Sequence, residues 1–255
     1  MKFHHPQCRN AFTLIELLAV LILVAVLVGL LLPAFPRAGT GAAMAGCANN
    51  MKQVSLGFLV WVNDNPKSTY PWRVEAADGG TKNHKSGLQN NAWFQYAWLS
   101  NELLNPKVLA CPADKQAIPA DSFDDSPQAG LLHRNYQNQS CSYNLGVDAG
   151  QNQPAAVPYC TAASRTEEDF LLSDRNLNHA LAQSGSCASG LNPVYELVVG
   201  NTQWLPKSNY GHGKMGHVGL CDGSVQKTGH KEFNEIISKN LDRGKGHCLP
   251  PRPTP

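Results

Sequence analysis

Residues 12–36 read FTLIELLAVLILVAVLVGLLLPAFP, and this stretch sets the organisation of the 255-residue chain. Apolar residues fill 20 of its 25 positions, and the 19 residues from Leu17 to Phe35 carry no charge. A helix needs about 20 apolar residues to cross the hydrocarbon core of a bilayer. Lys2 and Arg9 precede the run without any acidic residue, which predicts a cytoplasmic N-terminus and an exported remainder. We therefore expect one membrane-spanning segment at the start of the chain.

Three interpretations of this segment compete, and Glu16 separates them. A secretory signal peptide has an apolar run of about 7–15 residues before a small-x-small site. Here the run is longer, and the AGTGAAMAG stretch that offers such sites follows two prolines. A plain membrane anchor explains the run, but a carboxylate near the start of an apolar span is costly in lipid. The third interpretation gives Glu16 a role in assembly; the simpler alternative is a helix-start carboxylate that meets the helix dipole.

Residues 11–16, AFTLIE, together with the apolar run resemble the class III signal of type IV pilins and type II secretion pseudopilins. The shared features are a short basic leader, a small residue before the cut, Phe after it and Glu four residues further on. The resemblance implies cleavage between Ala11 and Phe12 by a cytoplasmic-side prepilin peptidase, followed by N-methylation of Phe12. The family normally has Gly before the cut, where this chain has Ala11.

Cleavage would give Phe12 a new α-amino group, with Glu16 about one helical turn further along. In low-dielectric surroundings, an amine–carboxylate pair between neighbouring subunits is strongly favoured over two unpaired charges. We therefore expect Glu16 to fix subunit register during assembly. As partners, the resemblance implies other pilin or pseudopilin subunits, in a homopolymer or heteropolymer, and an inner-membrane assembly platform.

The chain divides by composition into four segments. These are a cleaved basic leader at 1–11, a transmembrane and assembly helix at 12–36, an amphipathic continuation of the stem helix at 37–65, and a periplasmic head at 66–255. Pro33 and Pro36 should weaken or kink the stem helix. The amphipathic segment is indicated by apolar residues recurring every three or four positions, namely Met44, Cys47, Met51, Val54, Phe58 and Val62.

The head has short apolar runs between polar loops, which predicts an α+β fold with a small antiparallel sheet. The expected helices are Gln89–Leu104 and Lys231–Leu241. The expected strands are Lys107–Cys111, Phe170–Leu172, Tyr195–Val199, Val218–Cys221 and Val225–Lys227.

Residues 210–225, YGHGKMGHVGLCDGSV, contain a histidine, nine residues and Asp-Gly: His212 and Asp222-Gly223. With NNMKQVSLGFLVWVNDN, TYPW, VLACPAD, CSYNLGV and FLLSDRNLN, this H-x9-DG pattern resembles a bacterial pseudopilin-like group with large heads. Asp-Gly between two strands predicts a two-residue type I′ hairpin, and His212 should bond a turn carbonyl or Asp222. A metal site of His212, His217 and Asp222 is the rival interpretation. Its spacing matches no dedicated motif, so no metal ligand is assigned.

Eight cysteines are present, of which Cys8 would leave with the leader. The other seven lie on the exported side, where an oxidising compartment favours disulfides. Because seven is odd, at least one thiol should stay free or pair between chains. We expect Cys47 to be that residue, since it lies in the stem.

Charge and motifs exclude several functions. A net charge of +2 is too small to indicate a nucleic-acid partner. No G-x-S-x-G, H-E-x-x-H, P-loop or G-x-G-x-x-G occurs, so no catalytic residue is assigned and no enzyme is expected. No cofactor is expected either, although some pseudopilin heads bind calcium through loop oxygens. The candidate calcium site is the acidic cluster of Asp121, Asp124 and Asp125. A solvated loop is the preferred interpretation of this cluster.

The sequence therefore favours a prepilin-like structural subunit in the bacterial inner membrane, with a single pass and a periplasmic head. It would assemble into a type II secretion or type IV pilus-like filament. The alternative is a membrane-anchored periplasmic domain with an uncleaved anchor and a metal-binding or hydrolytic site. The two hypotheses differ most simply in the mature N-terminus.

Overall fold

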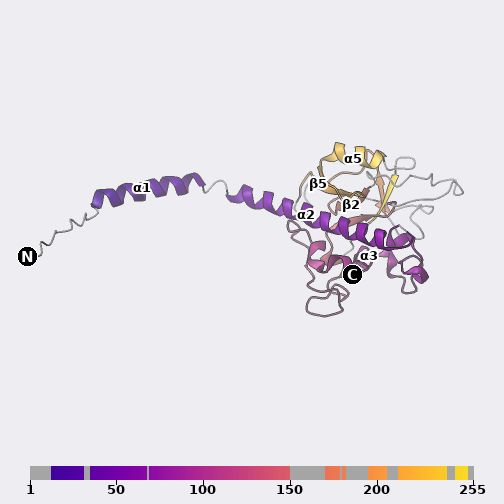
Figure 1. Ribbon diagram of the computed structural model, residues 1–255. Helices are drawn as coiled ribbons and strands as arrows, with labels where there is room; N and C mark the ends of the chain where they lie inside the picture. The colour runs from indigo at the N-terminus through magenta and orange to yellow at the C-terminus, as the bar shows by residue number, and fades with distance from the viewer. Residues whose placement is uncertain are drawn as a thin grey trace, which may run out of the picture. The chain divides into compact units, whose positions relative to one another are not determined.

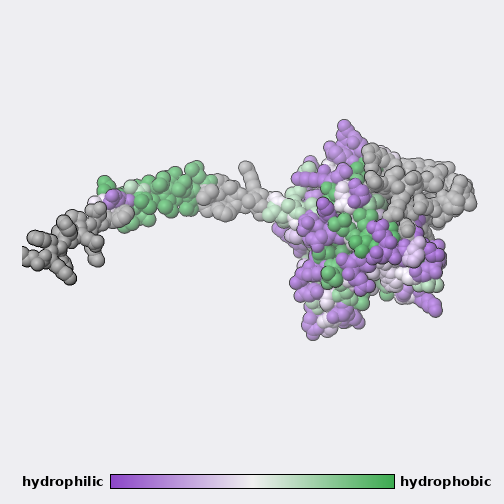
Figure 2. All heavy atoms as spheres, in the orientation of Figure 1, coloured by the Kyte–Doolittle hydropathy of each residue, from purple (hydrophilic) through white to green (hydrophobic). Residues whose placement is uncertain are grey.

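The computed structural model describes residues 13–31, 35–67, 69–149, 170–178, 180–181, 195–205, 212–239 and 245–251. The chain forms two compact units, Met1–Ala42 and Ala43–Pro255. Helix α1, Leu14–Leu31, lies in the first unit (Figure 1). Every side chain described from Thr13 to Leu30 is exposed to solvent. Figure 2 shows the resulting apolar surface along this helix.

The membrane-spanning prediction covers residues 12–36, of which 12 and 32–34 lie outside the described part of the chain. Within the described ranges, no helix has both the length and the apolar character required to cross a membrane.

Helix α2, Phe35–Asp64, begins in the first unit and continues into the second. Pro36 falls in its first turn, where a missing backbone N–H leaves no helical bond unmade. The apolar stripe expected along this segment is confirmed from Cys47 onward: the side chains of Cys47, Met51, Val54, Phe58 and Val62 are all 0% exposed. The second compact unit therefore starts within α2, earlier than the head predicted from residue 66.

Within the described ranges, seven antiparallel strands form one sheet, which confirms the α+β prediction. Their order across the sheet is β3-β4-β7-β1-β2-β5-β6. The strands are β1 Tyr143–Gly146, β2 Phe170–Asp174, β3 Ala180–Leu181, β4 Tyr195–Val198, β5 Gly216–Leu220, β6 Val225–Thr228 and β7 Lys245–Leu249. The predictions for β2, β4, β5 and β6 are confirmed, whereas β1, β3 and β7 were not predicted.

Two helices cover opposite faces of the β2–β5 part of the sheet (Figure 1). α2 lies close to β5 because Gly219 of β5 has no side chain at the contact. A Cβ atom at this position would lie 2.9 Å from Ser55 Oγ. On the other face, Phe233 of α5, His230–Lys239, packs with Val218 in a second apolar core. Since side chains alternate along a strand, His217 shares the α2 face with Gly219.

Short helices connect α2 to the sheet: η2 Pro71–Arg73, η3 Ala76–Asp78, η4 Leu88–Asn90, α3 Ala92–Ala97, α4 Ser100–Leu103, η5 Pro106–Leu109 and η6 Gln137–Ser140. The single helix predicted over Gln89–Leu104 is therefore wrong, because three short helices, η4, α3 and α4, occupy this range. The strand predicted at Lys107–Cys111 is also wrong. Pro106 opens a 3₁₀ helix there, and the side chain of Asn105 caps it by accepting from the Lys107 backbone N–H at 3.0 Å.

An aromatic cluster joins α2 to this helical region. The ring of Phe58 contacts those of Tyr70, Trp72 and Tyr96, with centroid distances of 6.0, 5.4 and 6.1 Å. The Trp72 indole donates to the Val147 carbonyl at 3.0 Å, and the Tyr96 hydroxyl donates to the Tyr143 carbonyl at 3.0 Å. The polar tips of Trp72 and Tyr96 are thus satisfied while the apolar faces of the rings form the core.

Candidate functional site

The first candidate site is the start of α1, where Thr13 and Glu16 bond to each other. The Thr13 backbone N–H and hydroxyl donate to Glu16 Oε2 at 2.9 and 2.8 Å. The Glu16 backbone N–H returns a bond to Thr13 Oγ1 at 3.4 Å. This reciprocal pattern is a capping box, which satisfies backbone donors that have no partner inside the helix.

The capping box supports the simpler alternative for Glu16, a carboxylate that stabilises its own helix start. Ala11 and Phe12, the residues predicted to flank the cleavage site, lie outside the described part of the chain. The pairing of Glu16 with the amine of a neighbouring subunit therefore stays a prediction.

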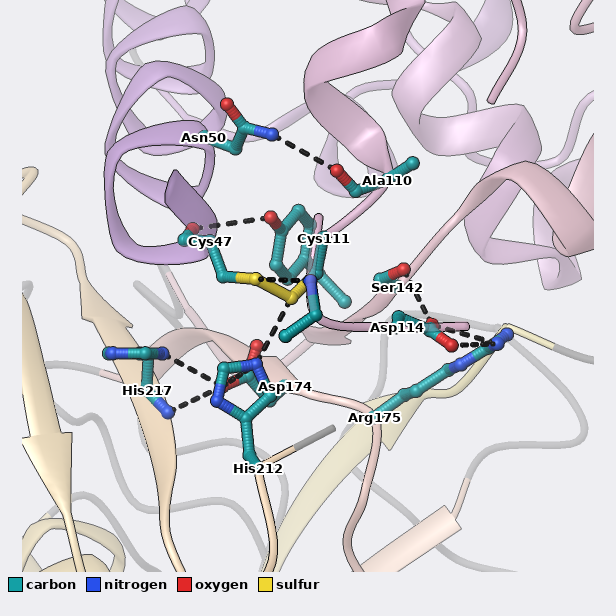
Figure 3. Close-up of a disulfide and its surroundings, with 12 residues drawn as sticks. Cys47, Asn50, Ala110, Cys111, Asp114, Ser142, Asp174, Arg175, His212 and His217 are labelled. Carbon is teal, nitrogen blue, oxygen red and sulfur yellow. Dashed lines mark hydrogen bonds and ion pairs between the residues drawn. A yellow bond between two sulfur atoms is a disulfide. The ribbon is translucent and has the colours of Figure 1, made fainter. Parts of the chain in front are cut away.

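A second candidate site lies inside the second unit, around the carboxylate of Asp174 at the end of β2 (Figure 3). The backbone N–H of His217 donates to Asp174 Oδ2 at 2.7 Å, and His217 Nδ1 lies 3.0 Å from the same oxygen. His212 Nε2 lies 3.6 Å from it. Asp174 Oδ1 and His212 Nδ1 have no hydrogen-bond partner among the described residues. These three side chains form the Asp-His-His cluster.

A disulfide between Cys47 of α2 and Cys111 borders the cluster, and His212 Nε2 lies 3.0 Å from Cys111 Sγ. The prediction that Cys47 keeps a free thiol is therefore wrong. A stem position suggested an unpaired thiol, but this part of α2 is packed in the core, against the segment that holds Cys111. Cys8, Cys160 and Cys187 lie outside the described residues.

A buried ion pair lies beside the cluster. Arg175 Nη2 is 2.8 Å from Asp114 Oδ2, with side-chain exposures of 12% and 1%. The Ser142 hydroxyl donates to the same carboxylate at 2.7 Å. Although Asp174 and Arg175 are neighbours in sequence, the arginine pairs with Asp114, while Asp174 pairs with the two histidines.

Burial sets the protonation of the buried groups. Burial lowers the pKa of His212, and the nearby Asp174 carboxylate opposes this change. The lowered pKa favours a neutral imidazole at neutral pH. Burial raises the pKa of the Cys141 and Cys248 thiols, so both stay protonated and unreactive in the folded chain.

The H-x9-DG residues occupy two different places. The predicted hairpin between β5 and β6 is confirmed, but its turn type is wrong. Leu220 N–H donates to the Ser224 carbonyl at 2.9 Å, which leaves a three-residue loop, and positive φ occurs at Gly223 (83°) but not at Asp222. This is a type I turn followed by a glycine bulge rather than type I′.

Asp222 therefore bonds within its own turn. It is exposed, and its Oδ1 accepts from the Ser224 backbone N–H at 2.7 Å. His212 contacts Asp174 and Cys111 in place of the predicted turn carbonyl or Asp222. Gly223 faces α2, where a Cβ would lie 3.1 Å from Leu56. The two ends of the pattern thus hold the C-terminal hairpin against α2.

The acidic cluster considered for calcium belongs to an exposed loop. Asp121 pairs with Lys107 at 3.0 Å. Asp124 Oδ1 accepts from the Ser122 hydroxyl at 2.7 Å and from the Ser126 backbone N–H at 3.0 Å, and these bonds lower its pKa. Both carboxylates thus have protein partners, Asp121 in η5 and Asp124 within its own loop, which suits a solvated turn.

Comparison with known protein families matches residues 7–32 to the prokaryotic N-terminal methylation motif. The match is to a prepilin-type signal. It supports a pilin- or pseudopilin-like class and processing by prepilin peptidase, and it points to a structural subunit rather than an enzyme. The curated proteins and the solved structures contain no match to the chain.

The predictions made from the sequence did not include several residues of the two sites. The Thr13-x-x-Glu16 spacing is itself a capping-box signature and could have been recognised. Asp174 ends an apolar strand, FLLSD, but nothing local links it to histidines about 40 positions later. Cys111 and Arg175 likewise gain their partners only through the fold.

Proposed function

We propose that this protein is a prepilin-like structural subunit of a type II secretion or type IV pilus-like filament. Prepilin peptidase would cut between Ala11 and Phe12, and Phe12 would then be methylated. The observation that carries the proposal is the prepilin-type signal at residues 7–32, which includes a helix whose side chains are exposed at every described position.

The exposed surface of α1 supports assembly through this helix. Its large side chains include Leu17, Leu21 and Val24, with 57%, 59% and 48% of their surface exposed. A helix that is hydrophobic all round requires an apolar environment. We propose that lipid surrounds it before assembly and that the equivalent helices of neighbouring pilin-type subunits surround it afterwards, delivered by an inner-membrane assembly platform.

Two observations support a periplasmic location for the head. Lys2 and Arg9 precede the apolar run, which favours retention of that end in the cytoplasm. The Cys47–Cys111 disulfide suits an oxidising compartment. The proposed topology is a single pass through the inner membrane, between a cytoplasmic N-terminus and the periplasmic head.

Glu16 offers a test that separates assembly from helix capping. Glutamine can replace glutamate in a capping box, but it carries no charge. Glu16→Gln should therefore keep the start of α1 and still abolish filament incorporation, as Glu16→Ala should. The measurement is the fraction of subunit in sheared or detergent-resistant filaments, with Thr13→Ser as the control that retains both the hydroxyl and the charge. Normal incorporation of Glu16→Gln would assign Glu16 to capping alone and contradict the proposed pair.

The Asp-His-His cluster is the observation that favours the alternative, an anchored domain with an uncleaved N-terminus. A hydrolytic role suits it poorly, because the three side chains are only 1–5% exposed in the part of the chain that the structure describes, and a substrate needs accessible groups. A metal ion that is already in place when the head has folded would need no such access. Metal binding is therefore compatible with a filament subunit, and the two hypotheses are separated by the mature N-terminus.

A further inference from the structure

We propose that Asp174, His212 and His217 form a buried binding site for one divalent transition-metal ion of the zinc class. The three residues come from separate places: the end of β2, the segment before β5, and β5 itself. One ligand atom from each lies within 4.8 Å of the others. Figure 3 shows both imidazole rings directed at the carboxylate, beneath the disulfide.

The distances suit a common ion. Tetrahedral zinc with bonds of about 2.0–2.2 Å places its ligand atoms about 3.4 Å apart. Asp174 Oδ2 lies 3.0 Å from His217 Nδ1 and 3.6 Å from His212 Nε2. Small side-chain rotations would therefore bring the three donors to bonding distance.

The carboxylate is held in place and still has an oxygen to offer. The backbone N–H of His217 fixes Asp174 Oδ2 at 2.7 Å, which is the kind of supporting bond that orients metal ligands. Asp174 Oδ1 has no hydrogen-bond partner among the described residues, although the side chain is only 3% exposed. Polar atoms buried this deeply nearly always have a partner, and a cation bound by both oxygens of the carboxylate would supply one.

The donor types select the metal. Two imidazole nitrogens and one carboxylate oxygen are typical of zinc and related transition metals. Calcium prefers six to eight oxygen ligands, which this cluster does not offer. The neighbouring Cys47 and Cys111 sulfurs are joined to each other and cannot serve as thiolate ligands. The site therefore has three protein ligands and takes its fourth from a small molecule such as water.

The test uses the full chain, purified in detergent under non-reducing conditions and stripped of metal with a chelator. Zn²⁺ is titrated in competition with a chromophoric chelator, and Co²⁺ is added separately for its absorption spectrum. We expect one Zn²⁺ per chain and a Co²⁺ spectrum with ligand-field bands but no sulfur-to-cobalt charge-transfer band. Zn²⁺ should also raise the Tm of the wild-type head.

Two variants test the histidine ligands, and a third serves as the control. His212→Gln and His217→Gln should each weaken Zn²⁺ binding by more than about tenfold, the loss typical even of residues that only support a ligand. His133→Gln, which changes a histidine outside the cluster, should bind as the wild type does. Circular dichroism of each variant reports whether it has folded.

Several results would overturn the proposal. The proposal is overturned if the folded wild-type chain does not bind one Zn²⁺ per chain, whatever the variants do. Binding that survives in both His212→Gln and His217→Gln places the metal elsewhere. Binding that appears only after reduction, with a sulfur charge-transfer band, assigns it to Cys47 and Cys111 instead. None of these measurements depends on filament assembly.

Discussion

Helix α1 and the half of α2 that begins at Cys47 are both helices with many apolar residues, but they are stabilised in opposite ways. α1 leaves every described side chain exposed, whereas α2 buries a stripe whose members are completely covered. The apolar residues of α1 surround the whole helix, and those of α2 follow one face. A one-sided stripe fits a core inside the same chain, while an all-round apolar surface needs lipid or other subunits.

This difference shows that the two regions depend on different kinds of sequence feature. The N-terminal region acts through a short linear signal, so that a stretch of 26 residues matches a known motif. The head acts through residues that are far apart in sequence, such as Cys47, Asp174 and His212, and become neighbours only after folding. We expect substitutions in the head to change its stability and substitutions in α1 to change assembly.

The largest expected contrast comes from matched truncations of the two helices. Phe58→Ala removes a side chain that is 0% exposed and should destabilise the head by about 3–5 kcal/mol. Leu21→Ala, at a position 59% exposed, should change that value by less than about 0.5 kcal/mol. Urea unfolding followed by tryptophan fluorescence measures both, since all five tryptophans lie between residues 61 and 204. Equal losses would contradict the division between the helices.

The disulfide gives the next largest effect. Cys47 and Cys111 are separated by 64 residues, so replacing both with serine should cost about 2–4 kcal/mol. The same unfolding experiment measures the loss under non-reducing conditions. Adding reductant should bring the wild type down to the stability of the double variant. If reductant leaves the wild type unchanged, the disulfide does not stabilise the head.

A smaller effect is expected at the hairpin that packs on α2. Gly223→Ala places a Cβ at a φ of 83° and 3.1 Å from Leu56. The backbone conformation alone costs about 1–2 kcal/mol. Gly200→Ala is the control, because Gly200 has a φ of 84° with nothing within 4 Å. Gly223→Ala should destabilise the head more than Gly200→Ala does, and equal losses would show that contact with α2 contributes nothing.

The smallest effect concerns the capping box of α1. Thr13→Ala removes the hydroxyl and should weaken the first turn by about 1 kcal/mol, which accelerates its amide exchange roughly fivefold. Thr13→Ser keeps the bonds and should exchange at the wild-type rate. Hydrogen exchange measured in detergent micelles follows this turn separately from the head. Unchanged exchange in Thr13→Ala would mean that the box does not hold the helix start.

The apolar stripe of α2 followed from periodicity, α1 from an uninterrupted apolar run, and the fold class from short apolar runs between polar loops. The alternation of three and four positions between Cys47 and Val62 was enough to predict the buried face of α2, and Asp222-Gly223 was enough to place the hairpin. Its turn type was wrong, because only Gly223 adopts a positive φ. The strand predicted at Lys107–Cys111 failed because the proline and the asparagine cap at its start favour a 3₁₀ turn over extended pairing.

The buried site could be predicted only in part. His212 and His217 lie close in sequence and were both recognised as candidates. Their carboxylate is Asp174 rather than the nearer Asp222, and this choice depends on the pairing of β2 with β5, which joins Ser173 to Val218. Cys47 was assigned wrongly for the same reason, since its partner approaches only through packing against α2.

The intact mass of the protein from a membrane fraction that contains prepilin peptidase shows whether the chain is a processed prepilin-type subunit. We expect a chain that has lost residues 1–11, begins at Phe12 and carries one added methyl group. A peptidase-deficient host should yield the unprocessed chain, and Ala11→Gly should be cleaved at least as completely as the wild type. A full-length N-terminus in the peptidase-containing membranes would contradict processing and favour the uncleaved anchor.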